Sequence, residues 1–290
     1  MKLLVRHQTV YRYAAATGRV AMRLKLMPVD TPAQTVLDWR VSVNDEPLTD
    51  FQRNSYGEME AIWIRHDRLD HAVIVAEGLV DTRETHGVVG GPASCVNPMH
   101  YLRDTPLTRA SPAIADMARA LPQDDSPLGR LHALSAAVTD AVQYRSGVTT
   151  AATTAAQAFT LGAGVCQDHS QIFIAAARTI GVPARYVTGY LLAGDGDALH
   201  ETHAWAEAHV PGLGWVGFDP SNRVCVTERY VRVASGLDAD DAAPIRGSVT
   251  VAGDIWIDAD VRIAQAEEGV EERQLQRQQQ QSVPPPERTG

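Results

Sequence analysis

The first 88 residues alternate between apolar and polar side chains in short runs. Two examples are Met22-Arg23-Leu24-Lys25-Leu26 and Trp39-Arg40-Val41-Ser42-Val43. A period of two places successive side chains on opposite faces of a strand, so these runs are typical of half-buried antiparallel strands. At ordinary strand lengths the segment predicts an all-β, sandwich-like domain of about seven strands.

The pattern changes after residues 87–98, which are rich in glycine, proline and asparagine and indicate a connection between domains. Ser111-Pro112 and Ser126-Pro127 each place a capping residue before a proline suited to the first helical position. Apolar residues then recur at helical spacing and predict a helix over 127–142. Strand-like runs follow at 185–192, 202–210 and 215–218.

These changes divide the 290 residues into four parts. We expect an N-terminal β-domain at 1–88, a linker with a short helix at 89–125 and a mixed core at 126–264. A tail follows at 265–290, with four consecutive glutamines and then three prolines. Its composition cannot bury a core, so we predict that it is disordered. The predicted fold class is therefore α+β behind an all-β domain.

Composition and charge exclude several classes of protein. Hydrophobic residues make up 44% of the chain and charged residues 21%, which is typical of a globular protein. The formal charge of −9 argues against a nucleic acid or an anionic membrane as the main partner. Three cysteines are too few, and of the wrong parity, for a disulfide framework. Because neither a signal peptide nor a membrane-spanning apolar run is recognisable, we expect a cytoplasmic protein.

The candidate chemistry begins where a glycine-rich segment becomes a helix, at Gly164-Val165-Cys166. A thiol in the first helical turn lies near unpaired N–H groups and the positive end of the helix dipole, which favour the thiolate. His203 lies in the later strand-like run at 202–210 and shares one face of it with Trp205 and Glu207. Asp219 ends the next run, so neighbouring strands would bring its carboxylate beside the imidazole of His203.

Cysteine, histidine and a carboxylate on successive elements are the groups that acyl transfer by a thiol requires. We interpret Cys166 as a nucleophile that attacks a carbonyl, and His203 as the general acid and base. Asp219 would orient the imidazole and stabilise its charged form. The backbone N–H of Cys166 would be one oxyanion donor, and Gln143 or Tyr144 is a candidate for the second.

Four sequence blocks resemble the transglutaminase-like superfamily of bacterial proteins, which are relatives of papain-like cysteine peptidases. The blocks are Gly164-Val165-Cys166-Gln167-Asp168, residues 180–190, His203-Ala204-Trp205-Ala206-Glu207 and residues 214–220. They occur in the order of the family and at compatible spacing. Near the start, Tyr11-Arg12-Tyr13 and residues 50–54 resemble the β-rich domain of one bacterial subfamily, although a common Gly-Asn pair there reads Arg53-Asn54.

The resemblance implies a papain/transglutaminase-like core, with a cysteine at a helix N-terminus packed on an antiparallel sheet that carries the histidine and the aspartate. It also implies activity as a transglutaminase-like protein or cysteine peptidase on a protein or peptide substrate. Some relatives are encoded beside a proteasome-related hydrolase, so association with such a system is implied by the resemblance alone.

Several other residues have more than one interpretation. His169 lies on the same helix face as Cys166 and would tune the thiol, line the pocket or serve the structure. Trp205 is interpreted as core or pocket wall, and Asp168 as a helix-start charge. For Cys95 and Cys225 we expect small buried side chains. The acidic residues at 238, 240 and 241 are expected to lie in solvent.

Three functions remain open from the sequence. A thioester at Cys166 would be resolved by water, giving a peptidase or amidase, or by an amine, giving a transglutaminase. We favour hydrolysis because no amine site is recognisable. The alternatives are a zinc-stabilised protein, from Cys166-x-x-His169 and His200-x-x-His203, and a non-catalytic interaction module. Against the zinc site, residues three apart in an extended strand point to opposite faces, so His200 and His203 should not converge. We expect neither a metal nor a cofactor.

Overall fold

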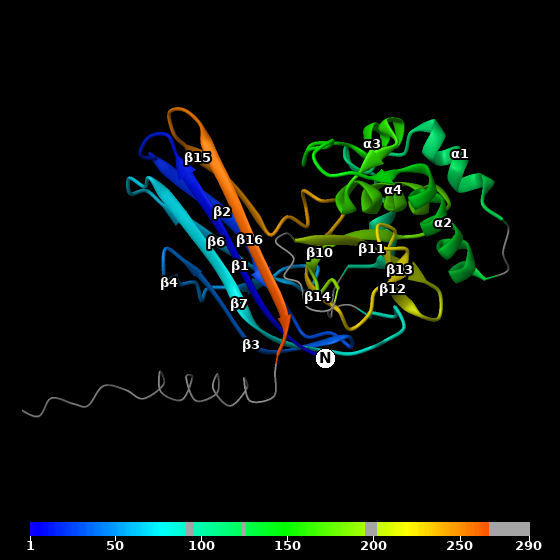
Figure 1. Cartoon of the computed structure of the whole chain (residues 1–290), viewed down its shortest axis with the longest axis horizontal. Coiled ribbons are helices and arrows are strands. Elements are labelled where there is room, and N and C mark those ends of the chain that lie inside the picture. Colours follow the sequence, from blue (N-terminus) through cyan, green and yellow to red (C-terminus); the bar gives the residue numbers. More distant parts are fainter. Residues whose placement is uncertain (91–95, 123–125, 195–201, 267–290) are drawn as a thin grey trace, which may run out of the picture.

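The structure is a computed structural model that describes residues 1–90, 96–122, 126–194 and 202–266. Its elements form two regions, a β-sandwich and a core in which helices pack on a sheet (Figure 1). The predicted α+β fold with a strand-rich N-terminal region is confirmed. Cys95, His200 and the predicted tail from residue 267 onward lie outside the described residues.

The sandwich is built from two antiparallel sheets. Within the described residues, one sheet has the strand order β16-β1-β7-β3-β4 and the other β15-β2-β6-β5. The strands are β1 Lys2–Tyr13, β2 Arg19–Met27, β3 Gln34–Val43, β4 Glu46–Pro47, β5 Gln52–Arg53, β6 Met59–Arg65, β7 His71–Thr82, β15 Ile245–Thr250 and β16 Ile255–Gln265. The apolar face of β2 is buried as the alternation predicts, with Leu24 fully buried and Leu26 1% exposed.

The predicted core range of 126–264 needs a correction, because its last two strands belong to the sandwich. Strand β16 pairs with β1, with Leu3 opposite Gln265 and Tyr11 opposite Ile257. Strand β15 pairs in the same antiparallel manner with β2. The local alternation pattern of a strand says nothing about a partner more than 200 residues away, so the sequence could not indicate this return of the chain.

The core places four helices with a five-stranded antiparallel sheet of order β13-β12-β11-β10-β14, as far as the described residues extend. Its elements are α1 Pro112–Ala120, α2 Pro127–Ala141, β8 Gln143–Tyr144, α3 Ala155–Leu161, β9 Ala163–Gly164, α4 Cys166–Thr179, β10 Ala184–Leu191, β11 His203–Val210, β12 Gly214–Asp219, β13 Val224–Cys225 and β14 Tyr230–Gly236. A short 3₁₀ helix, η1 Pro98–Leu102, precedes them.

The helix starts follow the predicted capping chemistry. Ser111 Oγ accepts a hydrogen bond from Ile114 N at 3.3 Å, and Ser126 Oγ accepts one from Gly129 N at 3.2 Å. Each of these bonds satisfies a backbone N–H group that has no partner within its helix. The helix predicted over 127–142 is confirmed as α2, which ends one residue earlier.

Strand β11 has two different faces, and this difference positions the site. Ala204, Ala206 and Ala208 pack into the cluster that contains α4. Trp205 lies on the opposite face, in a separate aromatic cluster. Because alanine side chains are short, α4 can lie close against the sheet. Its first turn is then near His203, the first residue of β11.

A cluster of four buried charged side chains joins the sandwich to the core; we refer to it as the interface charge cluster. Arg232 Nη2 lies 2.9 Å from Glu58 Oε1 of the sandwich, and Arg232 Nε lies 3.3 Å from Glu207 Oε1. Arg185 Nε donates to Glu207 Oε2 at 2.6 Å, and its guanidinium lies 4.0 Å from the ring centre of Trp215. None of the four charged side chains is more than 6% exposed. Two cations and two anions therefore compensate one another away from water.

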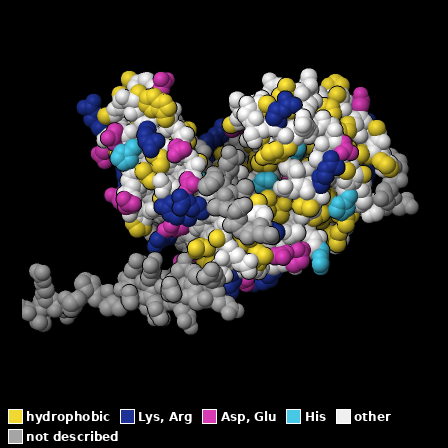
Figure 2. Space-filling model, in the orientation of Figure 1, with side chains coloured by type: hydrophobic (Ala, Val, Ile, Leu, Met, Phe, Trp, Pro, Cys, Tyr) yellow, Lys and Arg dark blue, Asp and Glu magenta, His cyan; other side chains and the backbone are white. Residues whose placement is uncertain are grey.

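The ion pairs on the outside of the sandwich are of a different kind. On the face shown in Figure 2, basic and acidic side chains are interspersed over the sandwich. Arg6 Nε lies 3.2 Å from Glu77, which also binds Arg40, and Arg65 lies 2.6 Å from Glu46. Exposed pairs contribute about 0–1 kcal/mol each. No helix among the described residues is long and apolar enough to span a membrane.

The burial of His7 is expected to make the protein less stable in acid. His7 is 4% exposed, and it forms 3.0 Å hydrogen bonds with the Tyr190 hydroxyl and with Thr9 Oγ1. Burial lowers the pKa of His7 from 6.5 to about 4. Between these pH values the unfolded chain binds more protons, so stability is complete above pH 6.5 and falls as the pH drops. The loss reaches about 3 kcal/mol near pH 4.

Urea denaturation at pH 7 and at pH 4.5 measures this loss. His7→Gln is the control, because an amide can bond to both hydroxyl groups and does not titrate in this range. The variant is expected to lose less stability than the wild type. Equal losses in the two proteins would show that His7 does not cause the acid sensitivity.

Candidate active site

Cys166 is the first residue of α4, as the sequence predicts, and the short strand β9 and the extended residue Val165 precede it. Asp168 Oδ2 accepts hydrogen bonds from Val165 N at 2.8 Å and from Thr149 Oγ1 at 2.7 Å. A Cβ atom at Gly164 would lie 2.7 Å from the Cβ and Oδ2 atoms of Asp168, so only glycine fits there. Asp168 is 1% exposed. It therefore fixes the backbone that delivers Cys166 to the start of the helix.

His203 and Asp219 lie side by side at one end of the core sheet. His203 is the first residue of β11 and Asp219 the last of β12, and these two strands are antiparallel neighbours. His203 Nε2 lies 2.6 Å from Asp219 Oδ2, and the Asp219 carboxylate is fully buried. Because Nε2 is engaged with the carboxylate, Nδ1 is the ring nitrogen left to face another group.

The electrostatics of this pair favour the charged forms of both side chains. Burial acts to lower the pKa of His203, but hydrogen bonds with Asp219 and Cys166 and the charges of both raise it to about 10. Burial acts to raise the pKa of Asp219, whereas its hydrogen bond to His203, the charge of His203 and the bonds from Asn222 and Tyr230 lower it. The three residues singled out by the sequence therefore interact in one site.

Two residues that the sequence analysis missed complete the surroundings of the carboxylate. Asn222 Nδ2 and the Tyr230 hydroxyl donate to Asp219 Oδ2 at 2.7 and 2.8 Å. Asn222 follows Asp219 by three residues in a turn, a spacing that could have suggested it. Nothing local indicates Tyr230, because it stands on β14 at the opposite edge of the sheet from β13.

The remaining predicted site residues lie around these groups. His169 is fully buried, its Nδ1 lies 3.0 Å from Ser221 Oγ, and its ring stands edge-on to Tyr144. Trp205 is 1% exposed and stacks on the ring of His203, with centroids 6.3 Å apart. The side chain of Trp205 therefore forms a wall of the site.

Gln143 and Tyr144, the candidate oxyanion donors, form strand β8. This strand runs parallel to β9, with Tyr144 opposite Gly164. Gly164 lies two residues before Cys166. Gln143 is exposed, and its Oε1 accepts a hydrogen bond from Arg145 at 2.9 Å. The oxyanion role of the two residues stays a prediction.

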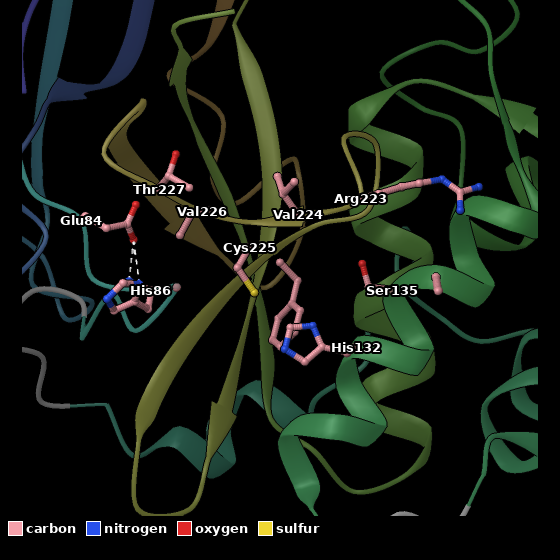
Figure 3. Close-up of a pocket in the computed structure, with 12 residues that line it drawn as sticks. Glu84, His86, His132, Ser135, Arg223, Val224, Cys225, Val226 and Thr227 are labelled. Atoms are coloured by element: carbon pink, nitrogen blue, oxygen red, sulfur yellow. Dashed lines mark hydrogen bonds and ion pairs between the residues drawn. The ribbon is translucent and has the colours of Figure 1, made fainter.

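Cys225 differs from the buried side chain expected from the sequence. It is half-buried and lines a cavity of about 530 Å³ together with Phe218, His132 and Arg223 (Figure 3). Cys225 of β13 pairs with Phe218 of β12, and Phe218 directly precedes Asp219 in the chain. The cavity lining contains neither Cys166 nor His203, so this space is separate from the candidate site.

The two thiols are expected to react at different rates with iodoacetamide. The charged imidazole of His203 lies beside the Cys166 sulfur, and reactive cysteines in proteins occur in such electropositive surroundings. Burial raises the pKa of Cys225, which keeps that thiol protonated. Mass spectrometry of peptides from briefly labelled protein should therefore find the label on Cys166 ahead of Cys225. Equal labelling of the two cysteines would contradict the reactivity assigned to Cys166.

Further charged side chains lie outside the candidate site, among them the acidic residues at 238, 240 and 241. No group of three or more His, Cys, Asp or Glu side chains among the described residues is arranged to hold a metal ion. The acidic loop is not a solvated surface throughout, which corrects the expectation from sequence. Asp238 is 6% exposed and accepts a bond from Asp241 N at 2.8 Å, and Asp241 lies 3.8 Å from the buried Lys25.

Comparisons with known proteins agree with this architecture. Residues 115–220 match the model of the transglutaminase-like superfamily, and residues 3–81 match that of the bacterial transglutaminase-like N-terminal region. Uncharacterized proteins of Mycobacterium bovis and Mycobacterium tuberculosis are 28% identical over 271 residues, covering 84% of this chain and 86% of theirs. The crystal structure of a candidate cysteine protease from Cytophaga hutchinsonii has a TM-score of 0.73. It is 22% identical and covers 92% of this chain and 91% of that chain, and this similarity is one of fold.

Proposed function

Because the chain belongs to the transglutaminase-like superfamily, we propose that it catalyses acyl transfer through a thioester on Cys166. The substrate would be a peptide bond or the side-chain amide of a glutamine. The observation that carries the proposal is the fully buried Asp219, 2.6 Å from the imidazole that also contacts the Cys166 sulfur.

In the first step the Cys166 sulfur attacks the amide carbonyl after its proton has passed to His203, whose imidazole is then charged. The tetrahedral intermediate carries a negative oxygen, for which the backbone N–H of Cys166 is a donor. His203 then protonates the leaving nitrogen, the C–N bond breaks and an amine leaves. Asp219 holds the imidazole in place and stabilises its charge throughout.

In the second step a nucleophile attacks the thioester, and His203 takes its proton. Water would release a carboxylic acid and regenerate the thiol, as in a peptidase or amidase. A primary amine would give a new amide instead, as in a transglutaminase. We propose hydrolysis, since no group among the described residues of the site is recognisable as a binding site for an amine.

Intact-mass analysis with a library of glutamine-containing peptides tests both steps. The expected result is a transient adduct on Cys166 and peptide products with a carboxylic acid in place of an amide, with or without added amine. Products that carry the amine would replace hydrolysis by transamidation. Absence of any acyl adduct on Cys166 across the library would overturn the proposal.

Asp219→Asn is expected to leave weak residual activity. An asparagine retains the shape of the side chain but donates through its nitrogen, so it favours the wrong tautomer of His203. By analogy with the serine-protease triad we expect a loss of kcat of about 100-fold or more. Steady-state kinetics on a peptide identified by the library measures this loss. An unchanged rate would show that Asp219 does not orient the imidazole.

A further inference from the structure

Three donors converge on one oxygen of the Asp219 carboxylate. Oδ2 receives His203 Nε2 at 2.6 Å, Asn222 Nδ2 at 2.7 Å and the Tyr230 hydroxyl at 2.8 Å. His203 belongs to the proposed mechanism, and Asn222 belongs to the turn that follows Asp219. Tyr230 belongs neither to the proposed mechanism nor to that turn. It is the first residue of β14, which pairs with β10 rather than with β12.

The Tyr230 hydroxyl is well suited to act as a permanent donor. The residue is 8% exposed, and its ring packs edge-on against Trp205 with centroids 5.4 Å apart. Burial raises the pKa of Tyr230, and the charge and hydrogen bond of Asp219 raise it further. The hydroxyl therefore keeps its proton and favours the ionised form of the carboxylate. It also fixes the direction in which Oδ2 faces His203.

The strand that carries Tyr230 is held by the sandwich. Gln34 Oε1 accepts from the backbone N–H of Arg232 at 2.8 Å, and Gln34 Nε2 donates to the Arg232 carbonyl at 2.9 Å. Glu58 Oε1 accepts from Arg232 Nη2 at 2.9 Å and from Ser235 Oγ at 2.6 Å. Both Gln34 and Glu58 are buried. They hold β14 at Arg232, which lies two residues beyond Tyr230.

We propose that Tyr230 is a positioning residue for Asp219, and that Gln34 and Glu58 of the sandwich hold β14 so that the hydroxyl reaches this carboxylate. The inference rests on the role of Asp219 in the proposed function. It makes the sandwich part of the catalytic apparatus, since two of its side chains determine where a donor to the site stands.

A double-mutant cycle tests the first half of the proposal. The rate at which iodoacetamide alkylates Cys166 is measured for the wild type, Tyr230→Phe, Asp219→Asn and the double variant. Loss of a hydrogen bond to a charged group is expected to slow alkylation about tenfold when Asp219 is present. In the Asp219→Asn background the same substitution should change the rate less than about twofold, because the two residues act as a unit. The same loss in both backgrounds, or none in either, would overturn the proposal.

Tyr56→Phe is the matched control. The Tyr56 hydroxyl donates to Asp241 Oδ2 at 2.9 Å, so it makes the same type of bond without contacting Asp219. Its removal is expected to leave the alkylation rate unchanged. If Tyr56→Phe slowed the reaction as much as Tyr230→Phe, the effect would come from general loosening and the positioning role would be wrong.

Glu58→Gln and Gln34→Met test the contribution of the sandwich. The second variant leaves no unpaired buried charge, so it is informative even if the first does not fold. Each is expected to slow alkylation several-fold when Tyr230 is present and less than about twofold in the Tyr230→Phe background. Wild-type rates in both variants would overturn the role of the sandwich.

The two proposals can fail separately, because alkylation needs no acyl substrate. The proposed function fails if no peptide acylates Cys166, whatever the outcome of the cycle. The positioning role fails if Tyr230 and Asp219 contribute independently, even in a protein that turns over peptides.

Discussion

Replacing Cys166 with alanine is expected to abolish peptide turnover while leaving the fold intact. No other described side chain at the site can form the thioester, so the loss of kcat/KM should reach about 10⁴-fold or more. The sulfur fills little space at the half-buried start of α4, and we expect the free energy of unfolding to change by about 1 kcal/mol or less. Kinetics with the library peptides and urea denaturation measure the two quantities.

Cys225→Ala provides the control for this experiment. It removes the other thiol in the described part of the chain from a cavity that does not include the proposed nucleophile. Turnover by this variant is expected to match that of the wild type. Full activity of Cys166→Ala would show that the thioester mechanism is wrong, and equal losses in both variants would indicate a structural effect.

Replacing Glu207 with leucine is expected to give the largest loss of stability. Burial acts to raise the pKa of Glu207, but the charges of Arg185 and Arg232 and their hydrogen bonds lower it, so the carboxylate is charged. Without it Arg185 loses its carboxylate partner in the interface charge cluster, and Arg232 retains only Glu58. Removing one partner of a buried ion pair costs about 3–5 kcal/mol. Denaturant-induced unfolding measures the loss.

Asp140→Asn is the corresponding change at an exposed pair. Asp140 Oδ1 lies 2.7 Å from Arg223 Nη2, with side chains 66% and 58% exposed. Its loss should cost at most about 1 kcal/mol, because water solvates both groups. If Glu207→Leu were as mild as Asp140→Asn, the charge cluster would contribute no more to stability than a surface pair.

The fold could be predicted wherever a short segment carries its own pattern. The alternation in β2 determines which face is buried, and the Ser-Pro pairs at 111 and 126 set where two helices begin. The same holds for His203 and Cys166. His203 begins a strand whose alternating faces can be read directly, and Cys166 follows a glycine-rich segment that leads into a helix.

Features that depend on distant partners could not be predicted in this way. Glu207 was placed on the face of His203, but its contact with Arg232, and through it with Glu58, depends on how the two regions dock. Tyr230 gives no local signal because its hydroxyl bonds to a residue on a strand with which it does not pair. The pairing of β15 and β16 with the sandwich was missed for the same reason.

The pairing of β1 with β16 has a consequence for how the chain is made. One edge of β1 has no partner until residues 255–265 have left the ribosome, whereas the core segments from α1 to β14 are complete before then. Contacts of such long range form slowly, and an unpaired strand edge readily binds other chains. A nascent polypeptide halted near residue 240 would therefore display two bare strand edges, on β1 and β2, and is expected to depend on chaperones until translation resumes.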